Sequence, residues 1–222
     1  MKKIIALSAA VGLLVSMALA VEVRSINTVG YHMHTVDPGD LCFVAPTVDN
    51  QDGDSLNDIF GSQLPVNSAA FIWNGLGFDT SIRTVFFGWS PNFTVLRGQA
   101  VFVQNSATAP GPVTFALRGE VPEARNAGGT TAVSVTSLDG VAYPYPTDIE
   151  FGDTQAAIAA PVNSSVFFWN KATQAYDPPT TKVVFFGWGA TDAKVVPVGE
   201  AYFMDVPSPV NVDEVQPYDL AM

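Results

Sequence analysis

The chain has 222 residues but only one cysteine, Cys42, and two histidines, His32 and His34. A single cysteine excludes a disulfide within the chain. Cys42 stands in an apolar run at residues 41–44, which predicts a small buried side chain. The alternative is a reactive thiol or a bridge to another chain. Outside the histidine pair, the chain offers no base for a hydrolase triad.

Basic residues are also scarce, since 10 Lys and Arg stand against 21 Asp and Glu, a net charge of −11. No Lys or Arg follows Lys194. This charge repels nucleic acid and anionic lipid, so neither is an expected partner. Acidity also keeps a protein soluble, and it therefore does not identify an electropositive partner.

Long helical patterns are missing beyond residue 20, whereas short runs with period-two alternation recur between 18 Gly and 16 Pro. Residues 29–36 alternate in this way, with the two histidines on one face. We interpret these histidines as solvent-facing residues of an edge strand; a metal site built on them lacks a visible third ligand. The only helix candidates are residues 55–60 and 154–159, with Asp54 and Asp153 as expected N-caps.

The first 20 residues have the features of a secretory signal peptide. Lys2 and Lys3 precede an apolar run that is too short to span a membrane, and Ala18 and Ala20 provide the small residues of a cleavage site. Removal of this segment leaves 8 basic and 21 acidic residues, a net charge of −13. We therefore expect an exported protein located in the periplasm, on the outer surface or outside the cell.

The rest of the chain contains the same sequence pattern twice. The spacing between corresponding residues grows from 96 to 101, so the insertions fall between the repeated blocks, as expected for surface loops between strands. The repeated blocks are residues 65–74 (PVNSAAFIWN) and 161–170 (PVNSSVFFWN), 84–89 (TVFFGW) and 183–188 (VVFFGW), and 98–103 (GQAVFV) and 199–204 (GEAYFM).

These features predict an all-β fold of two related sandwich- or barrel-like repeats, each with one short helix. The predicted organisation is a signal peptide at residues 1–20, a first β module at 21–124 and a second at 125–222. The two modules are able to pack as one pseudo-twofold domain. A Pro- and Gly-containing linker at residues 122–129 joins them. In the second copy, the prolines in residues 141–146 predict a broken strand where residues 41–45 form one.

The first copy resembles a secreted β module of Verrucomicrobia-type bacteria. The resemblance is carried by Val29-Gly30-Tyr31, the apolar strand at residues 41–45, the segment at 54–60, Gly88-Trp89 and the strand at 97–103. It covers most of the first copy and the second half of the second copy. The resemblance implies an exported β protein and brings no catalytic residues.

An aspartate-rich segment resembles the calcium loops of thrombospondin type 3 repeats. Asp49, Asp52, Asp54 and Asp58 surround Gly53, and calcium binds six to eight oxygen ligands of this kind. The bidentate acid of a full EF-hand loop is missing. The other interpretation is a polar turn whose Asp54 caps a short helix, and no cofactor is otherwise expected.

The four tryptophans occupy matching places in the two copies. Trp73 and Trp169 alternate in phase with phenylalanines and are expected in the core. Trp89 and Trp188 follow glycine, and exposed rings there would stack on sugars.

Two functions therefore remain. The first is a structural or interaction role at the cell surface without catalysis, with a protein or glycan as partner. The alternative is a non-catalytic carbohydrate-binding protein that uses Trp89 and Trp188. A secreted glycosidase is a more distant third.

Overall fold

The computed structural model describes residues 28–122 and 129–218. The predicted signal peptide and residues 123–128 of the predicted linker lie outside the described residues. Strands account for 45% of the structure and helices for 9%, in several antiparallel sheets. This confirms the all-β prediction.

Residues 28–122, called the first half, contain a two-stranded ribbon and a five-stranded sheet. The ribbon pairs β1 with β7 over eight residues, and the sheet has the order β2-β6-β3-β4-β5. The strands are β1 (Val29–Val36), β2 (Leu41–Val44), β3 (Ala69–Trp73), β4 (Phe78–Thr84), β5 (Gly88–Ser90), β6 (Val101–Gln104) and β7 (Val113–Glu120).

Residues 129–218, the second half, also pair their first strand with their last. This ribbon joins β8 to β16, and a separate sheet has the order β12-β11-β15-β9, with β13 also on β11. A short pair joins β10 and β14. The strands are β8 (Thr130–Val135), β9 (Leu138–Ala142), β10 (Ile149–Glu150), β11 (Ser165–Asn170), β12 (Ala175–Tyr176), β13 (Thr180–Thr181), β14 (Val195–Val196), β15 (Ala201–Asp205) and β16 (Val210–Val215).

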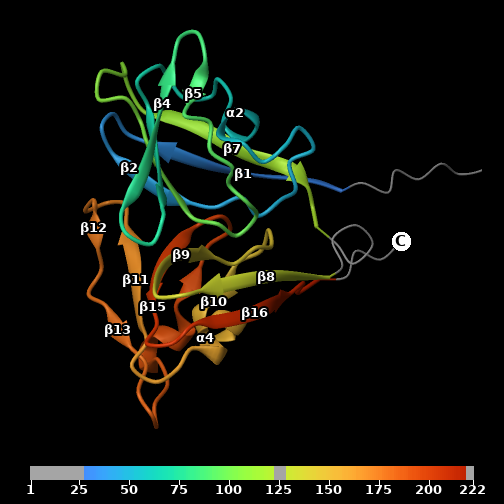
Figure 1. Cartoon of the computed structure of the whole chain (residues 1–222), viewed down its shortest axis with the longest axis vertical. Helices are drawn as coiled ribbons and strands as arrows, with labels where there is room; N and C mark the ends of the chain where they lie inside the picture. Colours follow the sequence, from blue (N-terminus) through green and yellow to red (C-terminus); the bar gives the residue numbers. More distant parts are fainter. Residues whose placement is uncertain (1–27, 123–128, 219–222) are drawn as a thin grey trace, which may run out of the picture.

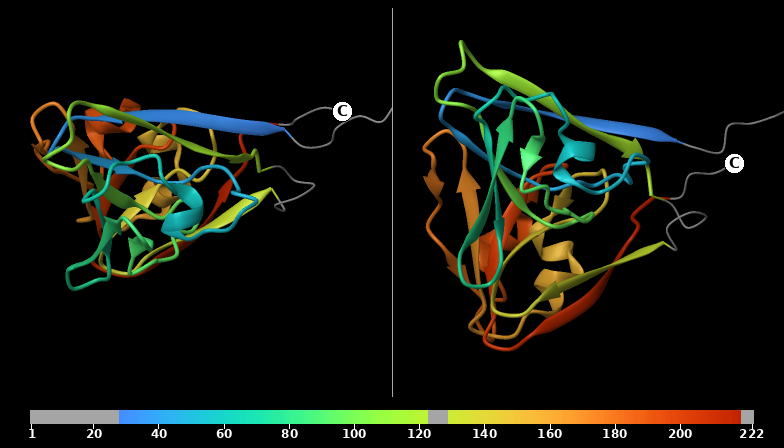
Figure 2. Two further views of the ribbon diagram at one scale, coloured as in Figure 1. Left: turned by 90° about the horizontal axis from the view of Figure 1, so that it is seen from above. Right: turned by 45° about the horizontal axis from the view of Figure 1, so that its top comes forward.

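The two halves lie one above the other, with the first half in blue to green and the second in yellow to red (Figure 1). In each half the ribbon runs along one side, and a short helix lies between the ribbon and the sheet (Figure 2). Each half buries its own apolar core. A third core lies between the two sheets and takes residues from both, including Phe43, Phe102 and Phe203.

The helices are short, as predicted, but their caps differ from the prediction. Helix α2 (Leu56–Ile59) is capped by Ser55, and α4 (Gln155–Ala159) by Thr154. The hydroxyl oxygens accept the backbone N–H three residues on, so Asp54 and Asp153 were the wrong residues by one position. Two 3-10 helices, η1 (Phe151–Asp153) and η2 (Gly189–Ala193), complete the helical residues. Within the described ranges, no helix has the length and apolarity to cross a membrane.

Two further predictions were wrong. The second half has an unbroken β9, because its prolines follow the strand instead of interrupting it. In β1 the alternation is as expected, but the faces are inverted. Tyr31 and Met33 are exposed, whereas His32 and His34 point inward. Gly30 lies on the inward face, where an added Cβ would come within 2.9 Å of Val121.

Candidate functional site

The two sheets meet through an aromatic layer. Phe43 of β2 stacks on Phe102 of β6, with ring centroids 4.1 Å apart, and on Phe203 of β15, with centroids 5.0 Å apart. These rings come from β2 and β6 in the first half and from β15 in the second half. The layer therefore holds the two halves together through apolar contact, which is roughly proportional to the area removed from water.

Two indoles tie the halves together from opposite sides. Trp73 at the end of β3 donates its Nε1–H to the carbonyl oxygen of Leu138, at 2.6 Å. Trp169 in β11 donates in the opposite direction, to the carbonyl oxygen of Leu41, at 3.3 Å. Leu41 begins β2 and Leu138 begins β9, so the two bonds are reciprocal. Both indoles are half-buried and pack against the third core, whereas the expectation placed each of them in the core of its own module.

The aromatic layer leaves two half-open cavities beside these indoles. The first has a volume of about 310 Å³ and the second about 250 Å³. Phe78 and Tyr176 line both cavities and are 44% and 42% exposed, so they form a shared rim. The other residues of the first cavity are Trp73, Leu138, Phe167 and Phe203, and those of the second are Leu41, Phe71, Phe102 and Trp169.

The chemistry of both cavities is that of an apolar site. No lining residue carries a charge, and the two indole N–H groups already donate to backbone carbonyls. Tyr176 supplies the one hydroxyl, and burial raises its pKa to about 12, so it stays protonated at neutral pH. Aromatic walls favour another ring in an edge-to-face or offset arrangement. The cavities therefore suit flat apolar groups.

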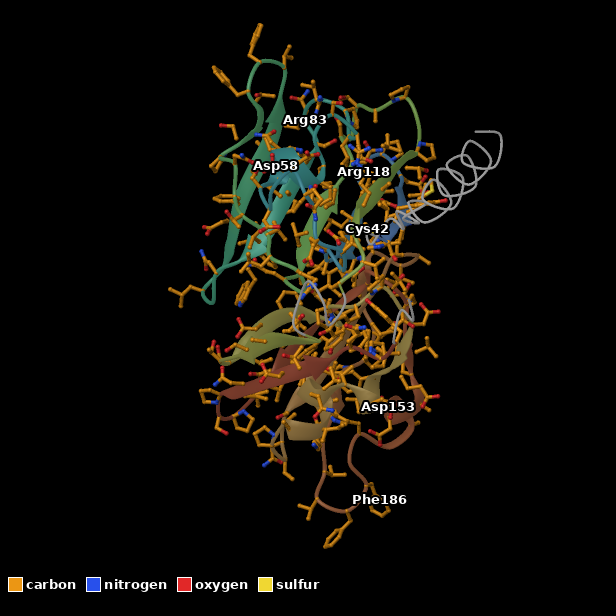
Figure 3. All side chains as sticks on the ribbon, turned by 90° about the vertical axis from the view of Figure 1, so that its right-hand side faces the viewer. Cys42, Asp58, Arg83, Arg118, Asp153 and Phe186 are labelled. Carbon is orange, nitrogen blue, oxygen red and sulfur yellow. The ribbon has the colours of Figure 1, made fainter. Side chains whose placement is uncertain are left out.

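Two loops present exposed phenylalanines to solvent. In the first Phe loop, residues 85–87 between β4 and β5, Phe86 is 90% and Phe87 78% exposed. In the second Phe loop, residues 184–186 between β13 and η2, Phe185 is 88% and Phe186 77% exposed. Figure 3 shows Phe186 at the lower end of the molecule, and the β4–β5 loop reaches the upper end in Figure 1.

Each Phe loop is closed by hydrogen bonds at its base, and a buried tryptophan follows it directly. In the first loop, Thr84 Oγ1 accepts from the Phe87 N–H at 3.2 Å. In the second, Val183 and Gly187 exchange two backbone bonds of 2.8 and 3.1 Å. Trp89 and Trp188 follow directly and are 1% and 3% exposed. The repeated FFGW sequence thus combines two displayed rings with one anchor.

The burial of Trp89 and Trp188 corrects the expectation of sugar-stacking rings. Trp188 donates its Nε1–H to the carbonyl oxygen of Ala157 at 3.0 Å and packs against Phe151. Trp89 packs against Phe60 in the first core. A ring that is closed to solvent has no face on which a sugar can stack.

The four aspartates of the calcium hypothesis either have other partners or are exposed to solvent. The Asp49 carboxylate accepts from Arg97 at 3.0 Å. Asp58 Oδ2 accepts from the Ser55 N–H and hydroxyl, completing a capping box. Asp52 and Asp54 are exposed. Over residues 28–122 and 129–218, no group of three or more His, Cys, Asp or Glu side chains is arranged to hold a metal ion.

The histidine pair is packed beneath β1. His34 lies 4.0 Å from Cys42 through Nδ1 and Sγ, and His32 lies 3.4 Å from Thr47 through Nδ1 and Oγ1. Burial lowers the pKa of His32 to about 4. Burial, together with the charges of His32 and Lys171, lowers that of His34 to about 3. Both imidazoles are therefore neutral at pH 7.

Cys42 itself is 5% exposed, and burial raises the pKa of its thiol to about 11. Its prediction as a small buried residue is confirmed.

The exposed phenylalanines are the residues that sequence reasoning missed. The repeated FF pairs at residues 86–87 and 185–186 were read only as part of the repeated blocks. The sequence feature that could have indicated their exposure is a pair of adjacent large apolar residues between a strand and a Gly-Trp turn. Adjacent residues in a strand point to opposite faces, so a run of this kind at a turn exposes at least one ring.

Comparisons of the chain with protein-family models, curated proteins and solved structures found no match.

Proposed function

We propose that the protein is an exported, non-catalytic interaction protein that contacts its partners through the two Phe loops. The observation that carries this proposal is that four phenylalanines, each at least 77% exposed, are displayed at the tips of two closed loops. Exposed apolar groups gathered in this way are typical of interaction sites. Phe86 and Phe185, the most exposed, make no contribution to either core.

The proposal includes a duplicated module as the origin of the two loops. The strand pairing supports it, because the first half pairs β1 with β7, β2 with β6 and β3 with β6, and the second half pairs β8 with β16, β9 with β15 and β11 with β15. The reciprocal bonds of Trp73 and Trp169 support it as well. Duplication gives one chain two copies of the same contact.

The placement of the loops favours bridging over attachment to one flat surface. The β4–β5 loop lies at one end of the molecule and the loop that carries Phe186 at the other (Figures 1 and 3). Two loops that point in opposite directions cannot both enter one bilayer. The acidic chain is also repelled by anionic lipid. Sugar binding through Trp89 and Trp188 is not proposed, because both are buried.

The experiment compares wild type and variants by the size of the complexes that the exported protein forms in the cells that produce it, measured by sedimentation of native extracts. The test variant is F86S/F87S/F185S/F186S, and the matched control is Y31T/M33T, which removes two exposed apolar side chains from β1. We expect wild type and control to sediment in complexes larger than the 23.6 kDa chain, and the test variant to sediment as a monomer. A monomeric wild type in those cells would contradict the proposal.

A further inference from the structure

We propose that the partner of each Phe loop is a second copy of this chain, with the rings of the loop seated in the aromatic cavities between the two sheets. The inference rests on the proposed function and names its occupant. One molecule carries both complementary parts, two protruding Phe loops and two aromatic cavities.

The loops are suited to act as the inserted part. Phe86 and Phe185 are 90% and 88% exposed, so nearly the whole ring is free to be covered. The hydrogen bonds that close each loop, to the Thr84 hydroxyl in the first and between Val183 and Gly187 in the second, hold the loop in place before contact. A preorganised group loses less conformational entropy on binding than a flexible one.

The cavities are suited to receive a ring. An apolar cavity of about 150 Å³ is enough to hold benzene. The two cavities, of 310 and 250 Å³, therefore have room for a phenyl group. Trp73 forms one wall of the first cavity, and Trp169 forms one wall of the second. A phenyl ring packed against an indole contributes about 0.5–1.5 kcal/mol beyond area burial.

The contact has to form between molecules. The Phe loops lie at the two ends of the molecule, whereas the cavities lie between the halves (Figure 1). A loop cannot reach the cavities of its own chain without unfolding β4 or β13, the strands that lead into it. The contact also joins different patches on the two copies, so it is heterologous. Repetition of such a contact builds an open chain of molecules, unless the rotation between successive copies brings the last one back to the first and closes a ring.

The size of the contact sets its strength. Each buried aromatic side chain removes about 150–250 Å² from water, so two rings bury well below the roughly 1,200 Å² of a stable interface. A single contact is therefore weak. Two loops and two cavities per molecule allow several contacts to act together, which raises the overall affinity without new chemistry.

Charge gives the inference a distinctive salt dependence. Residues 85–87, residues 184–186 and the cavity linings carry no charge, whereas the whole chain has a net charge of −11. Added salt screens the repulsion between copies and leaves the apolar contact in place. Association should therefore increase with ionic strength, opposite to assembly through ion pairs.

A small apolar molecule is the other occupant to consider. Ligand pockets usually measure about 300–1,000 Å³, and these cavities lie at or below the lower limit. The loops in the same chain match the cavities in number and chemistry, which favours the second copy.

The test uses the exported protein, purified, in sedimentation experiments over a range of protein and NaCl concentrations. The loop variant is F86S/F87S/F185S/F186S, and the cavity variant is F78D/Y176D, which places charges on the partly exposed rim shared by both cavities. Y31T/M33T is again the control. Circular dichroism establishes that each variant is folded.

We expect the wild type and the control to associate increasingly as protein and salt concentrations rise. The dissociation constant of each variant should be at least about tenfold higher than that of the wild type. The decisive result is a mixture of the two variants. The intact cavities of the loop variant then receive the intact loops of the cavity variant, so the mixture forms mixed complexes although each variant alone associates only weakly. Mixed complexes would also show that both variants are folded, because a misfolded chain cannot complement.

Three outcomes overturn the inference: a purified wild type that stays monomeric at high salt, a loop variant that assembles like wild type, or a mixture without mixed complexes. Binding of toluene to a monomeric wild type, detected by the fluorescence of Trp73 and Trp169, would instead assign the cavities to a small molecule. If the purified protein is monomeric while the complexes in cells still require the Phe loops, this inference fails and the proposed function stands.

Discussion

At the scale of single residues, the second half depends on a carboxylate that sequence reasoning did not single out. Glu214 in β16 is only 3% exposed, and its two oxygens accept from the backbone N–H groups of Gln155 and Ala156, at 3.0 and 2.9 Å. Burial raises the pKa of this carboxyl, and the two backbone bonds oppose that rise. The side chain therefore joins the last strand of the half to the start of α4.

We predict that Glu214→Gln destabilises the protein by about 1–3 kcal/mol, because one buried N–H of α4 loses its acceptor and meets an amide N–H₂ instead. Urea denaturation monitored by circular dichroism measures the change. Glu150→Gln is the control, since Glu150 is exposed and its replacement should change the free energy of unfolding by less than about 0.5 kcal/mol. Equal stability of the two variants would rule out this role.

His32 and His34 should make stability depend on pH. The pKa of each is depressed in the folded protein, to about 4 and about 3, against 6.5 for the free side chain. Well above pH 6.5 neither state binds a proton. As the pH falls from 6.5 towards 3, the unfolded chain takes up protons that the folded chain cannot, so the folded state loses stability.

The measurement compares the free energy of unfolding of wild type and His34→Gln between pH 7 and pH 4. The difference between the two proteins is needed because burial raises the pKa values of Asp49, Glu200 and Glu214, which acts in the opposite direction. Two further charges lie near His34: that of Lys171 lowers the pKa of the neighbouring Cys42, and that of Glu200 raises it. We expect a flatter acid limb in the variant, and identical profiles would contradict the prediction.

At the scale of elements, α4 is too short to be stable alone, and residues distant in the sequence supply groups at both ends. Lys182 Nζ donates to the carbonyl oxygens of Ala157, Ile158 and Ala160, at 2.8–2.9 Å. These are the carbonyls that the end of a helix leaves without intrahelical partners. Lys182 also precedes the second Phe loop, so the same side chain links the helix to the base of that loop.

Replacement of Lys182 by Met should therefore cost about 1–3 kcal/mol, since it removes three charge-assisted hydrogen bonds and keeps most of the apolar stem. Thermal unfolding gives the change in stability. Lys194→Met is the matched control, because its ion pair with Asp177 is partly exposed and pairs of this kind contribute about 0–1 kcal/mol. A loss in Lys182→Met no larger than that in the control would show that α4 does not need this cap.

At the scale of the whole molecule, the aromatic layer should make the two halves unfold together. Phe203 is 3% exposed and stacks on Phe43 across the contact between the sheets. We predict that Phe203→Ala costs about 3–5 kcal/mol, the range for a buried aromatic truncated to Ala. Hydrogen exchange should show equal loss of protection in β6 and β15. Loss confined to β15 would mean that the halves unfold independently.

Several features of the fold follow from local pattern. The alternation in residues 29–36 and the two short helices depend on neighbouring residues alone, and each was predicted close to its observed place. The burial of Cys42 also followed, because it stands in an apolar run. Trp73 and Trp169, in phase with apolar neighbours, are half-buried against the third core.

The sequence by itself determined the all-β class, the strands at residues 29–36 and 41–44 and the repeated blocks, since these depend on period and turn chemistry within a few residues. Only the tertiary structure decided which face of β1 is buried and whether Trp89 is exposed, because alternation separates two faces without saying which one meets a neighbour. It also decided that the aromatic residues of distant strands form cavities between the halves while the FF pairs remain outside. Both sets are equally apolar in sequence, and only long-range packing distinguishes a ring that has a partner from one that does not.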